Sequence, residues 1–415
     1  MHENNLIHTP LTSCRLCEGK SLRQVLQLAP TPAGDRYITK ESFPKKLPVF
    51  PLDLNQCEKC GHVQLGGIVD PTYLYRDYIY TTKSSLGLAE HFSNYATLTT
   101  EKLALKPGSL VVEIGSNDGT MLQAFKNLGM KVLGIDPARE IAIEATKAGI
   151  QTLPEFFSAE VAAGILSKHG HADLIIANNV MANVANVRLI AEAVRQLLAP
   201  NGVFVFETGY LKYLAEDCVF DNIYHEHIDY YAIRPLQRFF HSLDMRLTDV
   251  HVSQSKGSSI RCFVRLSDAC PEVSPIVEEL CEREKLHHYQ TPAPYRALST
   301  NLESIKSKLH EILQPAKKQG QTIAGFGASV GVTTVLYYFD LGQYISQLID
   351  DNPNRQGLFS PGLGIPVHSP GILYTSERPS WLILLAWRYG GVICQKHDAY
   401  EQAGGKFLKI LPAVG

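Results

Sequence analysis

The stretch from Pro107 to Pro137, PGSLVVEIGSNDGTMLQAFKNLGMKVLGIDP, constrains the fold more than any other part of this 415-residue chain. The apolar run LVVEI predicts a buried parallel strand, and Gly115 to Gly119 predicts a turn. MLQAFKNLG has the spacing of an amphipathic helix, and KVLGID predicts a second strand that ends in Asp136. Because neighbouring parallel strands need a crossover connection, this stretch predicts a βαβ unit.

Further strand-like segments follow in the order expected of a doubly wound sheet. Ala172 to Val180 (ADLIIANNV) and Asn201 to Gly209 (NGVFVFETG) are apolar runs with the character of buried strands. The segment LTDVHVSQSKGSSIRCFVRL predicts a closing antiparallel hairpin around Lys256. This alternation of strands and helices indicates the α/β class.

The glycine-rich turn predicts a cofactor site, and its acidic residues favour S-adenosylmethionine (SAM) over NAD. The pattern is ExGxNDG, with an acid inside the strand end and another in the turn. Asp136 is placed to accept both ribose hydroxyls, and Gly115 leaves room for the methionine part of the cofactor. NAD binding and a purely structural turn remain the alternatives. The predicted cofactor-binding residues come from this turn and from nearby strand ends: Glu113, Gly115, Asn117, Asp118, Gly119, Asp136, Asn178 and Asn179.

Four of the nine cysteines form two CxxC pairs near the N-terminus. Cys14 and Cys17 lie in CRLC, and Cys57 and Cys60 lie in CEKC. Two such pairs can supply four thiolates at tetrahedral geometry and leave no open coordination position, so we expect a structural zinc ion. Four unrelated core cysteines, or a redox CxxC that lacks its usual βαβ context, are the alternatives.

Bulk properties narrow the classes of function. A chain of this length predicts two or three domains, and a formal net charge of −2 argues against a nucleic-acid partner. No run of eighteen apolar residues and no signal-peptide pattern is present, so we expect a cytoplasmic protein without a membrane partner. From about Leu298 the strand–helix pattern restarts, and GxGxxxG at Gly325, Gly327 and Gly331 predicts a second Rossmann-like unit.

The segment FDNIYHEHIDYY, residues 220–231, concentrates polar side chains that suit acid/base chemistry. His225 and His227 are two residues apart, which suits a strand, and Glu226 points the other way, so a metal site lacks an evident third ligand. A histidine, with an ordinary pKa of about 6.5, can take a proton near neutral pH. A metal site and a plain polar loop remain the alternatives.

The combination of CxxC…CxxC, EIGSNDGTML, ANNV, FDNIYHEHIDYY and GFGAS…DDNPNRQGLFSPG resembles the sugar C-methyltransferases over essentially the whole chain. Those enzymes methylate a carbon next to the ketone of a nucleotide-linked 4-keto-deoxysugar. The resemblance implies a zinc-binding module at 1–75, a central doubly wound SAM-methyltransferase domain at 76–290, and a C-terminal Rossmann-like α/β domain at 291–415 that helps to bind the nucleotide sugar. It favours dTDP as the nucleotide and C3 over C5 as the methylated carbon.

The same resemblance implies roles for individual residues. His227 is expected to be the base, with Tyr224 and Glu226 lining the reacting sugar. A tyrosine from YLYRDYIYTTKSS also reaches the active site in the family, and Tyr78 and Tyr80 both match it. The candidates for substrate binding are His225 and Arg261, the latter through a bidentate grip on a phosphate.

The chain departs from the family where relatives often carry a histidine at Asn183 and a lysine near Gly331. The second departure leaves phosphate binding by the C-terminal glycine loop open. We expect a nucleotide-diphosphate 4-keto-deoxysugar as substrate and a monomer or weak dimer. Two alternatives remain: a SAM-dependent O- or N-methyltransferase of a sugar or natural product, and a zinc-containing binding protein with a non-catalytic methyltransferase fold.

Overall fold

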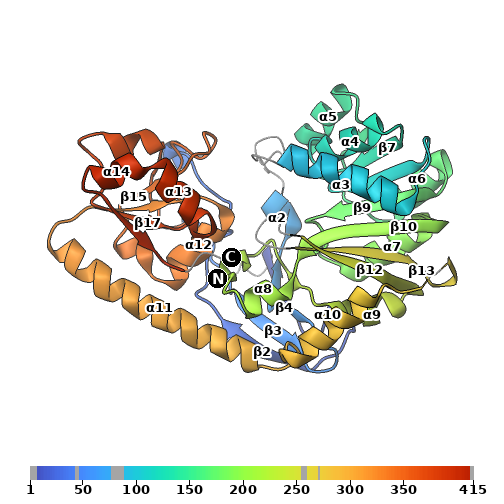
Figure 1. Cartoon of the computed structure of the whole chain (residues 1–415), viewed down its shortest axis with the longest axis horizontal. Helices are drawn as coiled ribbons and strands as arrows, with labels where there is room; N and C mark the ends of the chain where they lie inside the picture. Colours follow the sequence, from blue (N-terminus) through green and yellow to red (C-terminus); the bar gives the residue numbers. More distant parts are fainter. Residues whose placement is uncertain (1–6, 43–45, 76–87, 254–258, 270–271, 412–415) are drawn as a thin grey trace.

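The computed structural model describes residues 7–42, 46–75, 88–253, 259–269 and 272–411, and arranges them around four β-sheets (Figure 1). The largest sheet has seven strands in the order β12-β13-β10-β9-β6-β7-β8. Its strands are β6 (Leu110–Ile114), β7 (Lys131–Ile135), β8 (Thr152–Leu153), β9 (Ala172–Asn178), β10 (Leu198–Gly209), β12 (Met245–Ser253) and β13 (Ser259–Leu266).

Five of these strands are parallel, and β13 and β12 close the sheet as an antiparallel pair. The crossing order on either side of β6 is that of a doubly wound sheet. The predicted fold class is therefore confirmed. The tip of the predicted hairpin around Lys256 lies outside the described residues.

Alternating side chains of the central strands pack against helices on opposite faces of the sheet. Val111 and Val205 belong to a core cluster with residues of α3 and α4. Phe204 and Phe206 point to the other face, where both lie against Phe240 of α9. This two-sided burial explains why the strands are continuous apolar runs in the sequence. The helices of this domain are α3 (Leu88–Leu103), α4 (Thr120–Asn127), α5 (Arg139–Lys147), α6 (Ala159–His169), α7 (Val187–Leu197), α8 (Leu211–Ala215), α9 (Ile233–His241) and α10 (Pro275–Leu286).

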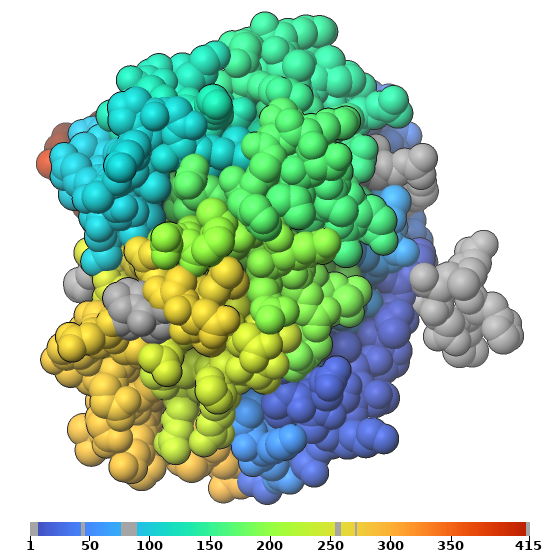
Figure 2. Space-filling view, turned by 90° about the vertical axis from the view of Figure 1, so that its right-hand side faces the viewer, coloured from blue at the N-terminus to red at the C-terminus, as the bar shows by residue number. Residues whose placement is uncertain are grey.

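The N-terminal module forms an antiparallel sheet whose outer strand comes from the middle of the chain. Strands β2 (Leu22–Gln27), β3 (Asp53–Cys57) and β4 (Val63–Leu65) are followed by β11 (Asp229–Tyr230), in the order β11-β4-β3-β2. Strand β1 (His8–Pro10) pairs with β5 (Gly67–Val69), and α2 spans Pro71–Tyr75. Figure 2 shows the N-terminal module (blue) directly against the seven-stranded domain (green).

The fourth sheet is fully parallel and forms the C-terminal domain, in the order β16-β15-β14-β17-β18. Its strands are β14 (Ile323–Phe326), β15 (Gln347–Ile349), β16 (Val367–His368), β17 (Trp381–Leu384) and β18 (Lys406–Lys409). Its helices are α12 (Val330–Tyr338), α13 (Gly390–Lys396) and α14 (Asp398–Gln402). The long helix α11 (Ala293–Lys318) runs past β2 and leads into this domain (Figure 1).

Helix α12 of the C-terminal domain packs against η3 (Phe220–Asn222), at the start of the polar segment 220–231. The aromatic ring of Phe220 lies 5.6 Å from that of Tyr338 and 5.3 Å from that of Phe339, and the Thr334 hydroxyl donates to the Ile223 carbonyl at 2.6 Å. A Cβ atom on Gly331 would lie 2.3 Å from the Asp221 carbonyl oxygen. The glycine therefore permits the close approach of α12 to this segment.

None of the helices among the described residues combines the length and the apolar character that crossing a lipid bilayer would require.

The contact at Gly331 predicts a cost for a single added methyl group. We expect Gly331→Ala to lower the free energy of unfolding by about 1–3 kcal/mol, the usual range for overpacking, because a backbone carbonyl occupies the space. Gly164 lies in α6 with no atom within 4 Å of an added Cβ, so Gly164→Ala should instead raise stability by about 0.5–1 kcal/mol. Chemical denaturation of both variants tests this, and equal stability of Gly331→Ala and wild type would contradict it.

Candidate active site

The turn after β6 has the backbone conformation that its glycines suggested. Gly115 (φ 72°), Asn117 (φ 47°) and Gly119 (φ 76°) all adopt the left-handed region, which favours glycine and tolerates asparagine. A Cβ atom on Gly115 would lie 2.4 Å from Cγ2 of Val180, in the loop after β9. The glycine therefore lets the loop after β9 pack closely against this turn at the carboxyl edge of the sheet.

Asp136 lies at the end of β7 and braces this turn. Its Oδ2 accepts the Asn117 N–H at 2.8 Å, and its Oδ1 accepts the Ala138 N–H at 2.9 Å. Burial raises the pKa of this carboxyl group, although the two N–H donors oppose the shift. Each carboxylate oxygen retains a second acceptor site, so both remain able to receive ribose hydroxyls.

Polar groups from adjacent strands surround the same edge. Glu113 is the penultimate residue of β6, with only 3% of its surface exposed, and its Oε2 has no hydrogen-bond partner among the described residues. Burial, and then the charges of Asp136 and Asp118, raise the pKa of Glu113 well above its ordinary value. Asn178 and Asn179 end β9, where the Asn179 N–H donates to the Glu207 carbonyl at 2.7 Å. An unsatisfied buried acceptor beside the glycine turn fits a bound cofactor.

The four cysteines form one compact cluster of thiols. The Sγ atoms of Cys14 and Cys60 are 3.6 Å apart, as are those of Cys17 and Cys57, and all four lie within 4.8 Å of one another. Ligands at about 2.3 Å from a tetrahedral zinc ion stand about 3.8 Å apart, so the cluster fits zinc.

The two knuckles that carry these cysteines share one backbone pattern. In each knuckle, the backbone N–H of the residue four positions after the first cysteine donates to the carbonyl of that cysteine. These hydrogen bonds run from Glu18 to Cys14 and from Gly61 to Cys57, each at 2.9 Å. Glu18 (φ 58°) and Gly61 (φ 82°) both adopt the left-handed conformation that closes such a turn. The repeated geometry supports a closed, structural metal site.

The segment 220–231 lies between all three domains, and the structure separates its two histidines. His227 is half-buried: its Nδ1 lies 3.0 Å from the Asn222 carbonyl and its Nε2 lies 2.8 Å from the Tyr224 hydroxyl. Because a carbonyl can only accept, Nδ1 carries the proton in the neutral ring and Nε2 accepts from Tyr224. His227 thus presents a basic nitrogen next to a hydroxyl group.

His225 and Glu226 are buried away from that nitrogen. His225 is 1% exposed and packs edge-on against Phe50 of the N-terminal module, and burial lowers its pKa to about 4. Burial, reinforced by the charge of Asp35, raises the pKa of Glu226 to about 8, which leaves its carboxyl group mostly protonated and able to donate at neutral pH. Its Oε2 has no hydrogen-bond partner among the described residues.

His227 lines a small pocket of about 50 Å³, together with residues that sequence reasoning missed. Asn183 is one of them, and its side-chain amide donates to the Tyr75 hydroxyl at 3.2 Å. Tyr75 belongs to the tyrosine-rich stretch YLYRDYIYTTKSS, which is expected to contribute a tyrosine to the active site. The predicted Tyr78 and Tyr80 of this stretch lie outside the described residues. The clue to Asn183 was its place in NNVMANV, directly after a strand that ends at the cofactor edge.

Arg261 is engaged within the protein. Its guanidinium donates to Oε2 of Glu207 at 2.9 and 3.0 Å and lies 3.5 Å from the centre of the Tyr95 ring. A phosphate would therefore compete with Glu207 for this group. Its proposed role in phosphate binding stays a prediction.

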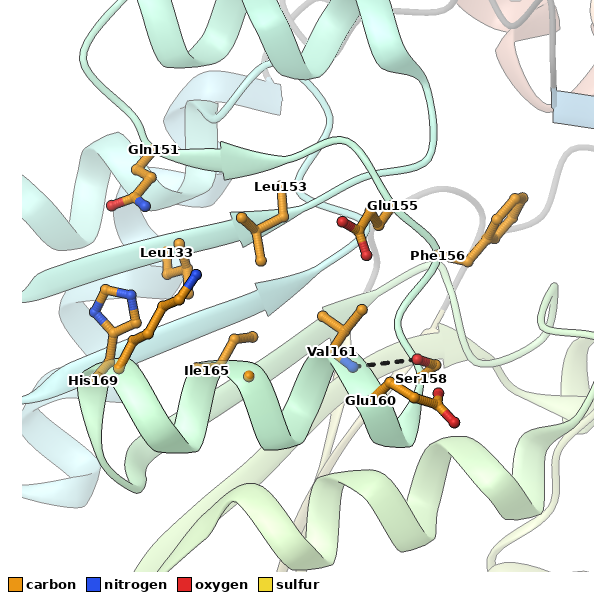
Figure 3. A pocket seen from close by; sticks show the side chains of 12 residues that line it. Leu133, Gln151, Leu153, Glu155, Phe156, Ser158, Glu160, Val161, Ile165 and His169 are labelled. Atoms are coloured by element: carbon orange, nitrogen blue, oxygen red, sulfur yellow. Dashed lines mark hydrogen bonds between the residues drawn. The ribbon is translucent and has the colours of Figure 1, made fainter.

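Pocket size alone does not identify the site. A larger cavity of about 530 Å³ lies between β7, β8 and α6, and Figure 3 shows Leu133 and Leu153 of the strands on one side of it and Ile165 of the helix on the other. None of the residues predicted for catalysis, cofactor or metal binding lines it. Two of the predicted site residues, His227 and Asn179, line the smaller pocket instead.

Three family models match successive parts of the chain. A domain described as zinc binding matches residues 14–75, a methyltransferase domain matches 88–250, and a C-methyltransferase C-terminal domain matches 254–412. With the glycine turn and the thiol cluster, these matches identify SAM and a zinc ion as the cofactors of this chain.

A similar protein is the C-methyltransferase NovU of Streptomyces niveus, 31% identical over 404 residues, which cover 97% of this chain and 96% of NovU. Similar solved structures are a SAM-dependent methyltransferase from Clostridium acetobutylicum (14% identity, 47% of this chain and 95% of that one, TM-score 0.34) and one from Anabaena variabilis (13%, 47% and 91%, TM-score 0.36). At these TM-scores the two structures carry no further argument.

The thiol cluster predicts one zinc ion per purified chain. Cys14→Ser should lose zinc and unfold at a lower temperature, because the metal supplies folding energy to the small N-terminal module. Cys394 lies in α13, far from the cluster in sequence, and Cys394→Ser should keep both the zinc and the unfolding temperature. Elemental analysis and thermal unfolding measure the two effects, and wild-type protein without zinc after growth in zinc-supplemented medium would contradict the prediction.

Asp136 predicts a loss of SAM affinity when its carboxylate is removed. Asp136→Ala should weaken binding by about 1.5–3 kcal/mol, the scale of hydrogen bonds to a charged group. Asp350 of the C-terminal domain offers a matched control because it accepts the N–H groups of Ala328 and Asn352 in the same arrangement. Titration calorimetry should give unchanged SAM affinity for Asp350→Ala, and unchanged affinity for Asp136→Ala would place the cofactor elsewhere.

Proposed function

The chain belongs to the family of SAM-dependent C-methyltransferases, and we propose that it methylates a nucleotide-linked 4-keto-deoxysugar at the carbon next to the ketone. We propose dTDP as the nucleotide and C3 as the methylated carbon. The observation that carries the proposal is the His227–Tyr224 pair, in which the imidazole that lines the small pocket lies 2.8 Å from a hydroxyl group.

His227 removes the proton next to the ketone in this proposal. A carbon atom becomes nucleophilic only after such a proton has left, and a histidine is suited to take it near neutral pH. The Asn222 carbonyl fixes the Nδ1–H tautomer, so Nε2 faces the pocket as the acceptor. SAM supplies an electrophilic methyl group to the resulting carbon nucleophile when it is bound at the Asp136 edge of the sheet.

Tyr224 supplies a donor for the charge that develops on the ketone oxygen. Its hydroxyl donates to Nε2 of His227, and an arriving ketone would offer it a second acceptor at the same place. Glu226, mostly protonated when buried, is a second donor on the same segment. Tyr78 and Tyr80 remain proposed contributors from the segment between the first two domains.

The remaining assignments complete the proposal. His225, held against Phe50, is proposed to support substrate binding indirectly, by fixing the segment that carries His227. The C-terminal domain, which we delimit at 291–415, is proposed to help hold the nucleotide. We further propose that the enzyme acts in the cytoplasm as a monomer or weak dimer.

Replacing the base should separate chemistry from cofactor binding. We expect His227→Ala to lower turnover by about 10²–10⁴-fold, the scale for loss of a general base, with SAM affinity unchanged. Exchange of the substrate proton next to the ketone with solvent deuterium should fall in parallel, because one residue performs the step behind both. Tyr224→Phe should slow methylation as well, and His225→Ala should be milder.

Turnover and the exchange of the proton next to the ketone are both measured by mass spectrometry of reactions with SAM and a panel of nucleotide 4-keto-deoxysugars. Near-normal exchange and turnover in His227→Ala would overturn the assignment of the base. Methyl transfer by the wild-type enzyme without any proton exchange would instead indicate an oxygen or nitrogen acceptor.

A further inference from the structure

A buried arginine joins the zinc module to the segment that carries His227. Arg15 lies between the two cysteines of the first knuckle, and its Nε donates to both carboxylate oxygens of Asp229, at 2.9 and 3.0 Å. The side chains of Arg15 and Asp229 are 5% and 0% exposed, and the two residues are 214 positions apart. Asp229 stands two residues after His227.

The Arg15 guanidinium also binds a second segment that lines the pocket. Its Nη1 donates to the Ala185 carbonyl at 2.7 Å, and its Nη2 donates to the Val184 carbonyl. These carbonyls belong to the loop after β9, which contributes Ala182 and Asn183 to the pocket. One planar group thus joins the loop after β9 to the segment that carries the base, which a lysine could not do with a single ammonium group.

Main-chain hydrogen bonds connect the His227 segment to the loop after β9 and to β4. The Ile228 N–H donates to the Ala182 carbonyl at 2.6 Å, and the Ile228 carbonyl accepts the Leu65 N–H of β4 at 2.8 Å. The knuckle itself is fixed to β4, because the Arg15 N–H donates to Oε1 of Gln64 at 2.9 Å. Gln64 is in turn the register partner of Asp229 in the sheet.

The side chain of Asp229 is fully buried, so its negative charge is stabilised by Arg15 and by other neighbouring side chains. His62 Nε2 lies 2.8 Å from its Oδ1, and the Tyr231 hydroxyl lies 3.4 Å from its Oδ2. Burial alone would raise the pKa of Asp229, but the charge of Arg15 and the bond from His62 hold it below its ordinary value. A buried ion pair of this kind is costly to break and contributes geometry more than net stability.

We propose that Arg15 is a positioning residue, through which the zinc-bound knuckle sets the place of the His227 segment relative to the loop after β9. The metal would then act on catalysis by fixing the geometry of the site, in addition to stabilising its module. The activity part of this inference rests on the proposed function.

The test compares Arg15→Gln, Arg15→Lys and Arg15→Gln combined with Asp229→Asn, which leaves no unpaired buried carboxylate. We expect Arg15→Gln to lower kcat by about 10²-fold, the scale of a misplacement of about 1 Å, with the Kd for SAM and the zinc content unchanged. Arg15→Lys should restore only part of kcat. The combined variant should be no slower than Arg15→Gln, because the two residues act as one unit.

Arg188 provides the matched control. It donates to the Leu16 carbonyl of the same knuckle at 2.8 Å, but comes from α7 and makes no contact with the His227 segment among the described hydrogen bonds. Arg188→Gln should therefore keep kcat within about twofold of wild type, on the scale of an ordinary partly exposed substitution. A loss of kcat equal to that of Arg15→Gln would mean that any disturbance of the knuckle has this effect, and would overturn the proposal.

Hydrogen–deuterium exchange gives a readout that does not depend on activity. In Arg15→Gln, and in wild-type protein stripped of zinc by a chelator, residues 182–185 and 224–231 should exchange faster, while residues 110–119 stay as protected as before. Wild-type protection of 224–231 in a zinc-loaded Arg15→Gln enzyme would overturn the proposal. If wild-type enzyme methylates none of the 4-keto-sugars, the proposed function fails, while the exchange data still decide the role of Arg15.

Discussion

The pairing of β11 with β4 is the interaction on which the arrangement of the active site depends. Two residues of a segment in the middle of the chain, Asp229 and Tyr230, complete a sheet that otherwise belongs to the N-terminal module. Because side chains alternate along a strand, this pairing fixes the faces to which the neighbouring residues point. His225 and His227 precede β11 and lie in and just after a turn, not in the strand that their spacing suggested. Their side chains therefore do not share a face: His225 packs against Phe50, whereas His227 lines the pocket.

The sequence predicted what depends on local patterns. The strand–turn–helix around Gly115 and its partner acid Asp136 lie within about one βαβ unit, so apolar runs and glycines were enough to place them. The metal site could also be predicted from the two CxxC pairs, because the spacing within each pair is typical of one metal-binding knuckle. The class of the fold followed from the order of such units.

Long-range contacts could not be predicted in the same way. Nothing near Arg15 in the sequence indicates that its partner is Asp229, because five of the seven strands of the large sheet lie between the two residues along the chain. Arg261 looked available for a phosphate from its place in a strand, but its partner Glu207 lies on the neighbouring strand in exact register. The sequence left phosphate binding by the loop near Gly331 open, and the structure places this glycine where α12 approaches the Asp221 carbonyl.

These contacts also set an order in time for the nascent chain. The bond between Asp136 and Asn117 closes over 19 residues, so the cofactor edge can form soon after it leaves the ribosome. The pairing of β11 with β4 has to wait for more than half of the chain, and the hydroxyl of Thr334 reaches the Ile223 carbonyl over a further 111 residues. Contacts of such separation are slow to form. A ribosome-bound fragment that ends before the C-terminal domain would therefore have its cofactor edge formed before the segment that carries His227 is held from both sides.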